Sequence, residues 1–305
     1  MGMPTTREKV TFETFALKTY LPSVQTHKKS VGTDISLLKN HLLPWFGRKL
    51  LLDIKPLDVQ SFVNALSNKG LAPSSRNRIL MLLKFMFNSA IKWEVSGVLS
   101  NPCKGIAELI ENNKMERFLT SDEAKCLRIS ISESTNPMLG PIVQLMMLTG
   151  CRKGEALNAK VSEFDFERST WFLPNPKGGK ARYIPMNERA VETAKSAILL
   201  SQSLSQNSHQ SEYLFANPRT GLPFEQIFSS WNTARKKAGL SDLRMHDLRH
   251  SFASAMVNSG MTLYDVKEIL GHANIKTTQR YAHLSNHRLR KAAESVSQFY
   301  GDKGW

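Results

Sequence analysis

The string HDLRHSFA at residues 246–253, followed by LGH at residues 270–272 and then by Tyr281, decides how the chain is interpreted. Residues spaced like His246 and Arg249 lie on one face of a helix. A tyrosine supplies an oxygen nucleophile, and an arginine with histidines faces the negative charge of a phosphate. If these residues converge in space, the sequence predicts metal-free attack on a phosphodiester.

The composition points to a polyanionic partner. The 305 residues include 41 Lys and Arg against 26 Asp and Glu, a net charge of +15. Residues 1–117 hold 17 basic and 9 acidic side chains, and residues 118–305 hold 24 and 17, so both halves are basic. Each Lys or Arg placed against a phosphate releases condensed counterions. The alternative is that the excess charge serves only solubility.

Cysteine usage and hydropathy exclude several classes of protein. Three scattered cysteines without a CxxC pair argue against a disulfide framework and against a Cys-based zinc site. The apolar runs are too short to cross a bilayer, and the first residues lack the apolar segment of a signal peptide. We therefore expect a cytoplasmic protein with no membrane partner.

The first hundred residues read as four helices, because their apolar residues recur at helical spacing. The third begins at Pro56 and the fourth at Pro73, as prolines often do at the first helical position. Arg76 and Arg78 in the first turn of the fourth helix are candidates to bind DNA phosphates, and a merely solvated face is the alternative. We predict a helical-bundle domain over residues 1–112.

A polar stretch at residues 111–117 lacks an apolar stripe, so we place a linker at residues 113–119 and a second domain at residues 120–305. The second domain should hold a helix at 141–148 and short strands near 164–166, 170–173 and 182–185. The remainder reads as helical. The fold class is thus mainly α with a small antiparallel β-sheet (α+β).

Five strings in the second domain carry a family resemblance. They are LTGCRKGEAL at 148–157, PKG at 176–178, HDLRHSFA at 246–253, LGH at 270–272 and RY at 280–281. In this order and spacing they resemble the tyrosine recombinase (phage integrase) family. The first domain resembles, more weakly, the helical core-DNA-binding domain of that family. Matched position by position, the resemblance implies six catalytic residues: Arg152, Lys177, His246, Arg249, His272 and Tyr281.

The resemblance implies a site-specific DNA recombinase with a C-shaped clamp around double-stranded DNA. Tyr281 would attack a phosphodiester, form a 3′-phosphotyrosyl bond and release a 5′-hydroxyl, which later reverses the step. No metal, ATP or other cofactor is implied. Self-association into a tetramer on two DNA sites is implied too, with room for accessory DNA-bending proteins. The biological setting would be integration/excision or resolution of bacterial or phage-borne DNA.

Elementary chemistry assigns roles to these residues. Guanidiniums are planar and always charged, so Arg152 and Arg249 suit the nonbridging oxygens of the transition state. Lys177 on a Gly-rich turn could protonate the leaving oxygen, with Lys180 as its rival. His246 could exchange a proton with Tyr281 or bond the phosphate.

Other polar residues take supporting or DNA-binding roles. His272 could donate to a nonbridging oxygen, and Glu155 could steer His272 or Arg152. We interpret His250 as a structural residue or as one that contacts the catalytic side chains without touching the substrate. Lys180 and Arg182 are candidates to contact backbone phosphates.

Several alternatives remain open on sequence grounds. His246 and His250 lie four apart, as in the zinc motif HExxH, but Asp247 replaces the glutamate and Arg249 would repel a cation. Type IB topoisomerase-like relaxation of DNA shares the covalent chemistry, and a non-catalytic DNA-binding regulator would share the fold. Tyr264 and the tyrosine at 300 lack the spacing of Tyr281. A terminal helix at about 286–299 could pack on its own domain or on a neighbouring protomer.

Overall fold

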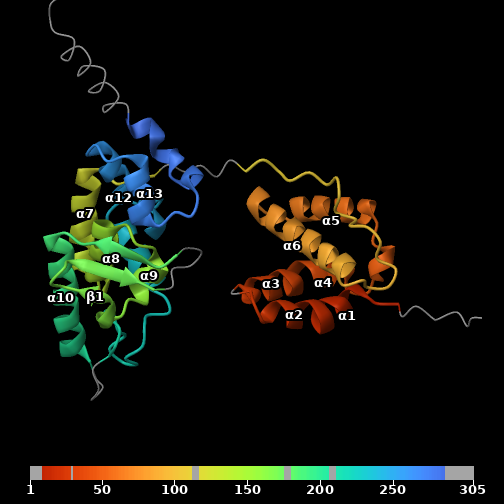
Figure 1. The fold of residues 1–305 in the computed structure, drawn as a ribbon, viewed down its shortest axis with the longest axis horizontal. Helices are drawn as coiled ribbons and strands as arrows, with labels where there is room; N and C mark the ends of the chain where they lie inside the picture. The colour runs from red at the N-terminus through yellow and green to blue at the C-terminus, as the bar shows by residue number, and fades with distance from the viewer. Residues whose placement is uncertain (1–8, 29, 112–116, 175–179, 206–210, 286–305) are drawn as a thin grey trace, which may run out of the picture. The chain divides into compact units, whose positions relative to one another are not determined.

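The computed structural model describes residues 9–28, 30–111, 117–174, 180–205 and 211–285. The chain divides into two compact units, Met1–Lys114 and Met115–Trp305, each shown in Figure 1. The fold is mostly helical with one small sheet, as predicted. Within the described residues, no helix has the length and apolar character needed to cross a membrane.

The first unit consists of helices around an apolar core. Its helical segments are α1 (Phe12–Thr14), a π-helical stretch (Phe15–Tyr20), α2 (Leu21–Gln25), α3 (Val31–Leu37), a second π-helical stretch (Leu38–Leu42), α4 (Leu43–Phe46), a 3-10 turn (Leu51–Asp53), α5 (Pro56–Asn68) and α6 (Pro73–Lys92). Pro56 and Pro73 begin α5 and α6, as the sequence predicts. The apolar faces of both helices are buried.

The second unit consists of seven α-helices and one three-stranded sheet within the residues that the structure describes. Its helices are α7 (Ser121–Ser132), α8 (Leu139–Thr149), α9 (Lys153–Leu157), α10 (Glu188–Leu204), α11 (Phe228–Lys237), α12 (Met245–Asn258) and α13 (Leu263–Leu270). Short 3-10 segments cover Val161–Glu163, Ile275–Thr277 and Gln279–Ser285. The strands are β1 (Phe164–Asp165), β2 (Thr170–Leu173) and β3 (Arg182–Pro185), antiparallel in the order β1-β2-β3. Trp171 of β2 pairs with Ile184 of β3.

The described end of the expected linker packs on the second unit. Arg117 donates to both carboxylate oxygens of Glu123, at 2.7 and 2.9 Å, and to Asp242 at 2.7 Å. The backbone N–H of Leu119 donates to the hydroxyl of Ser251 on α12 at 2.8 Å. Arg117 and Leu119 therefore both contact the second unit.

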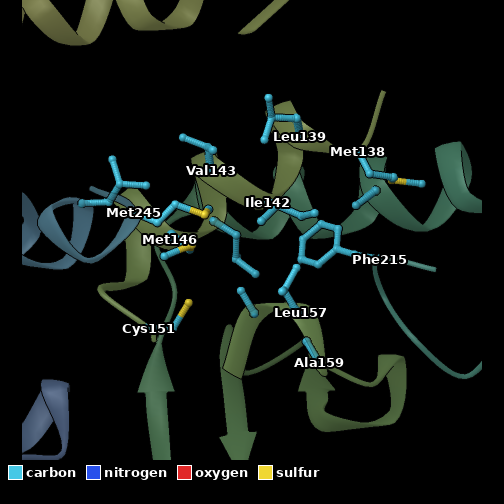
Figure 2. Packing of buried hydrophobic residues seen from close by; sticks show 14 of the residues in the cluster. Met138, Leu139, Ile142, Val143, Met146, Cys151, Leu157, Ala159, Phe215 and Met245 are labelled. Carbon is cyan, nitrogen blue, oxygen red and sulfur yellow. The ribbon is translucent and has the colours of Figure 1, made fainter. Parts of the chain in front are cut away.

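Helix α8 is the centre of the second core. Figure 2 shows its buried side chains, among them Ile142 and Met146, packed with Leu157 and Phe215 from later segments. Cys151 lies in the same cluster, and burial raises the pKa of its thiol to about 12. A core of this kind fixes the end of α8, and with it the residues that follow.

Two glycines end the helices that precede predicted site residues. Gly150 ends α8 and Gly271 ends α13, both with a φ of +64°. This left-handed conformation is the usual helix C-cap, and glycine adopts it without the penalty of a Cβ. A Cβ on Gly150 would also collide with Phe252 and would lie 2.8 Å from Cδ2 of Leu270.

The substitution Gly150→Ala should therefore destabilise the protein by more than the roughly 1 kcal/mol of left-handed strain alone. The matched control is Gly239→Ala, where φ is +76° but a Cβ would meet no atom within 4 Å. Thermal denaturation of both variants and the wild type measures the two effects. Equal falls in melting temperature would show that the close approach of Phe252 and Leu270 has no energetic weight.

Candidate active site

Helix α12 presents three of the predicted residues. His246, Arg249 and His250 follow the i, i+3, i+4 spacing that places side chains on one face. The ring centroids of His246 and His250 are 4.8 Å apart in an edge-on arrangement. The helix begins with a capping box, in which the carboxylate of Asp247 accepts from the backbone N–H of Arg244 at 2.7 Å. Asp247 is fully buried and also accepts from the Arg244 guanidinium.

Arg249 is a buried cation that joins three helices. Its side chain is 2% exposed, and it donates to the backbone oxygens of Gly150 at 2.8 Å and of Leu270 at 2.6 Å. Burial lowers the pKa of Arg249 to about 10, and the nearby charge of Arg152 adds to this effect. The guanidinium still carries its charge near neutral pH, and it is oriented by carbonyls on both sides.

Tyr281 lies against His250 in the same unit. The tyrosine is 6% exposed, and its hydroxyl is 2.5 Å from Nδ1 of His250. Burial lowers the pKa of His250 to about 4, with His246 as the next cause, so this imidazole is neutral near pH 7. Burial likewise raises the pKa of Tyr281, although Arg280 and Arg249 oppose the rise. The sequence left open whether His246 exchanges a proton with Tyr281 or bonds the phosphate; in the structure the imidazole that contacts the Tyr281 hydroxyl is that of His250.

Tyr281 also belongs to a small apolar cluster separate from the main core. Its other members are Ala253, Val257, Val266 and Leu270, from α12 and α13. The 3-10 segment that carries Tyr281 therefore docks on the helices that carry the site.

His272 follows the turn at the end of α13. Its Nδ1 lies 2.8 Å from the hydroxyl of Thr278, a fully buried residue that the sequence interpretation did not single out. Burial lowers the pKa of His272 to about 3, and the charges of Arg249 and Arg152 act in the same direction. When the Thr278 hydroxyl donates to Nδ1, the neutral ring carries its proton on Nε2.

Arg152 stands at the start of α9, next to Glu155. One carboxylate oxygen of Glu155 accepts from the Arg152 side chain at 2.8 Å, and the other from its backbone N–H at 2.8 Å. Glu155 was predicted to steer Arg152 or His272, and its contact is with Arg152. The same carboxylate also accepts from Arg182 at 2.9 and 3.2 Å. Arg182, predicted to face DNA phosphates, is thus turned toward Glu155.

The remaining predicted residues lie in the first unit, at the edge of the sheet, at the start of α12 or outside the described residues. Lys177 falls in residues 175–179, outside the described residues, and Lys180 is exposed just before β3. Arg76 and Arg78 lie in the first turns of α6 in the other unit, where Arg78 is exposed. His246 reaches solvent, yet partial burial and then Arg249 lower its pKa.

The second unit thus gathers two guanidiniums, two neutral imidazoles (His250 and His272), the imidazole of His246 with a lowered pKa, and one buried phenol. The charges of Arg152 and Arg249 both act on His246 and His272. Fixed cations beside a phenol suit the attack of the phenol oxygen on a phosphate. Among the described residues, no three His, Cys, Asp or Glu side chains lie together as possible metal ligands. The pair His246 and His250 is thus not part of a metal-ligand cluster there.

Comparison with known proteins agrees with this chemistry. Residues 109–288 match the Phage integrase family. Tyrosine recombinase XerA of Pyrococcus horikoshii is 31% identical over 247 residues, which cover 78% of this chain and 79% of the relative. Tyrosine recombinase XerC of Staphylococcus carnosus is 28% identical over 240 residues, which cover 77% and 79%.

Solved structures share the fold. A lambda integrase dimer bound to a COC′ core site has a TM-score of 0.71 at 19% identity, covering 89% of this chain and 95% of that one. The Tn1549 transposon integrase in complex with a circular intermediate DNA has a TM-score of 0.71 at 20% identity, covering 92% and 98%. The family match and the similarity to XerA over three quarters of the chain lead to one conclusion: the protein belongs to the phage integrase family and is a tyrosine recombinase, an enzyme that cleaves and rejoins DNA.

Proposed function

We propose that Tyr281 is the nucleophile of this recombinase. Its oxygen attacks a DNA phosphodiester, a 3′-phosphotyrosyl bond forms, and the 5′-oxygen leaves as a hydroxyl after taking a proton. A 5′-hydroxyl from the partner duplex then attacks the phosphotyrosine and restores Tyr281. The energy of the broken bond is kept in the phosphotyrosine, so the cycle needs no ATP. The observation that carries the proposal is the buried contact between the Tyr281 hydroxyl and His250.

That contact gives the phenolic proton an acceptor, which a tyrosine nucleophile needs. A phenol has a pKa of about 10, so only about 0.1% is ionised at neutral pH. Burial makes ionisation harder still. His250 is neutral and close enough to accept the phenolic proton as the oxygen attacks, and the charges of Arg280 and Arg249 favour the phenolate. We therefore give the proton exchange to His250 and leave His246 the other role considered from the sequence, a bond to the phosphate.

Arg152 and Arg249 hold the phosphate. Two of the N–H donors of Arg249 are used on backbone carbonyls, and its remaining donors are offered to a nonbridging oxygen. Arg152, partly exposed beside Glu155, offers a second guanidinium. His272 donates from Nε2 to the same phosphate, and His246, near the N-terminal end of α12, hydrogen-bonds that phosphate too. Lys177 protonates the leaving 5′-oxygen.

Double-stranded DNA is the partner, and both units contact it. The net charge of +15, spread over both halves, supports this arrangement. Arg76, Arg78 and Lys180 contact backbone phosphates. Four protomers assemble on two sites, with accessory DNA-bending proteins where the DNA requires them. The enzyme serves integration/excision or resolution, in the cytoplasm and at the nucleoid when bound to DNA.

The substitution Tyr281→Phe should abolish covalent attachment to DNA while leaving DNA binding within about threefold, because only the nucleophilic oxygen is removed. The cognate sequence is first selected from random duplexes with the full chain. A nicked version of that duplex then traps the phosphotyrosyl adduct, which denaturing gels detect. The matched control is Tyr264→Phe, which changes an exposed tyrosine and should keep wild-type adduct formation.

The same assay separates the competing functions. A wild-type chain that binds its site but never forms the adduct would be a DNA-binding regulator, and the proposal would fail. A chain that forms the adduct and relaxes supercoils without ever exchanging strands between two sites would act as a type IB topoisomerase.

The proposed roles of His250 and His272 require neutral rings. Because both rings are buried in the neutral form, the folded state should lose stability in acid. Their folded-state pKa values, about 4 and about 3, lie below the ordinary value of about 6.5. Below about pH 6.5 the two histidines bind protons in the unfolded chain but not in the folded chain. Stability therefore decreases as the pH is lowered from about 6.5 toward the folded-state pKa values. Urea denaturation between pH 7.5 and 4.5 should show this slope.

The variant His250→Gln removes one of these groups, so its unfolding free energy should depend less steeply on pH. The largest change expected is about 1.4 kcal/mol per pH unit. Identical slopes for the wild type, His250→Gln and His272→Gln would contradict neutral burial of both rings.

A further inference from the structure

Arg182 is the first residue of β3, and its side chain is directed into the protein. The side chain is 9% exposed, and Nη1 and Nη2 donate to separate oxygens of Glu155 at 3.2 and 2.9 Å. A two-point contact of this kind fixes direction as well as distance. Lys180, two residues earlier, is exposed. The two cations at this edge of the sheet therefore have different surroundings.

Glu155 is shared between two arginines. Its side chain is 7% exposed and contacts Arg182 on one side and Arg152 on the other. Burial by itself would raise the pKa of Glu155, but hydrogen bonds from Arg182 and from the backbone of Arg152 outweigh it and keep the pKa low. The carboxylate is therefore ionised, and it is held both from β3 by Arg182 and by the backbone N–H of Arg152.

Arg182 also lies against the turn that leads into His272. A Cβ built on Gly271 would come within 2.7 Å of Cδ and 2.9 Å of Nε of Arg182. Among the described residues, this buried Nε has no hydrogen-bond partner. The side chain thus passes over Gly271 on its way to Glu155, and glycine leaves the room that it needs.

We infer that Arg182 is a positioning residue of the recombinase site: it holds Glu155, which in turn aims Arg152 at the phosphate, and it seats the turn before His272. The inference rests on the proposed function, because it acts through Arg152. It replaces the expectation that Arg182 contacts a DNA phosphate. Arg182 thereby links β3 both to Arg152 and to the turn before His272.

Salt dependence of binding separates the two roles. A phosphate contact contributes about 0.9 to the slope of log affinity against log salt, whereas a positioning residue contributes nothing. We expect Arg182→Ala to keep the wild-type slope and to bind DNA within about threefold. Lys180→Ala is the matched control from the same edge, and it should lower the slope.

The rate of DNA cleavage should show whether Arg152 has been displaced. At saturating nicked DNA, Arg182→Ala should form the phosphotyrosyl adduct about tenfold to a hundredfold more slowly, as expected when a reacting group is displaced by a fraction of an ångström to an ångström. Arg182→Lys should recover only part of the rate, because an ammonium cannot bond both oxygens of Glu155 in the same way. Added guanidinium chloride, compared with equal sodium chloride, should accelerate Arg182→Ala and leave Lys180→Ala unchanged.

Gly271→Ala provides an independent displacement of the same side chain without removing a charge. It should slow cleavage as Arg182→Ala does, and the double variant should be no slower than the worse single variant. Wild-type cleavage by Arg182→Ala, or a reduced salt slope, would overturn the positioning role while leaving the nucleophile in place. Failure of the wild type itself to form an adduct would instead count against the proposed function.

Discussion

The buried guanidinium of Arg249 is the interaction on which the second unit's site depends. A cation withdrawn from water is costly unless its hydrogen bonds are met. Arg249 meets two of them with the carbonyls of Gly150 and Leu270, at the C-terminal ends of α8 and α13. Helix C-termini carry partial negative charge, so two helices together offset the charge of one side chain. The three helices are thereby locked at their ends.

This arrangement explains why residues far apart in the sequence come together. Both helices end in a left-handed glycine, which turns the chain sharply just where Arg249 binds. Arg152 follows Gly150 by two residues, and His272 follows Gly271 by one. Each turn therefore delivers a polar side chain to the neighbourhood of the same guanidinium. The string LGH is thus the end of a helix followed by a histidine that we propose contacts the phosphate.

Much of the architecture could be predicted from the sequence, because periodicity and capping are local signals. Pro56 and Pro73 mark helix starts in sequence and structure alike. Long-range pairings carry no such signal. His246 and His250 share one face of α12, so spacing alone could not tell which ring meets Tyr281. Arg182 finds its partner 27 residues away, where only the sheet and α9 together bring it.

The place of Tyr281 in an apolar cluster has a consequence for when the enzyme can react. Its ring fills part of a small core with Val257, Val266 and Leu270. Movement of the ring toward a phosphate would leave a void there, and voids left by aromatic side chains cost about 3 kcal/mol or more unless the surroundings collapse. Contacts with DNA have to offset that loss. If Tyr281 is the nucleophile that we propose, this packing is a safeguard: without DNA, the protein is most stable with the Tyr281 oxygen kept from water and from stray phosphates.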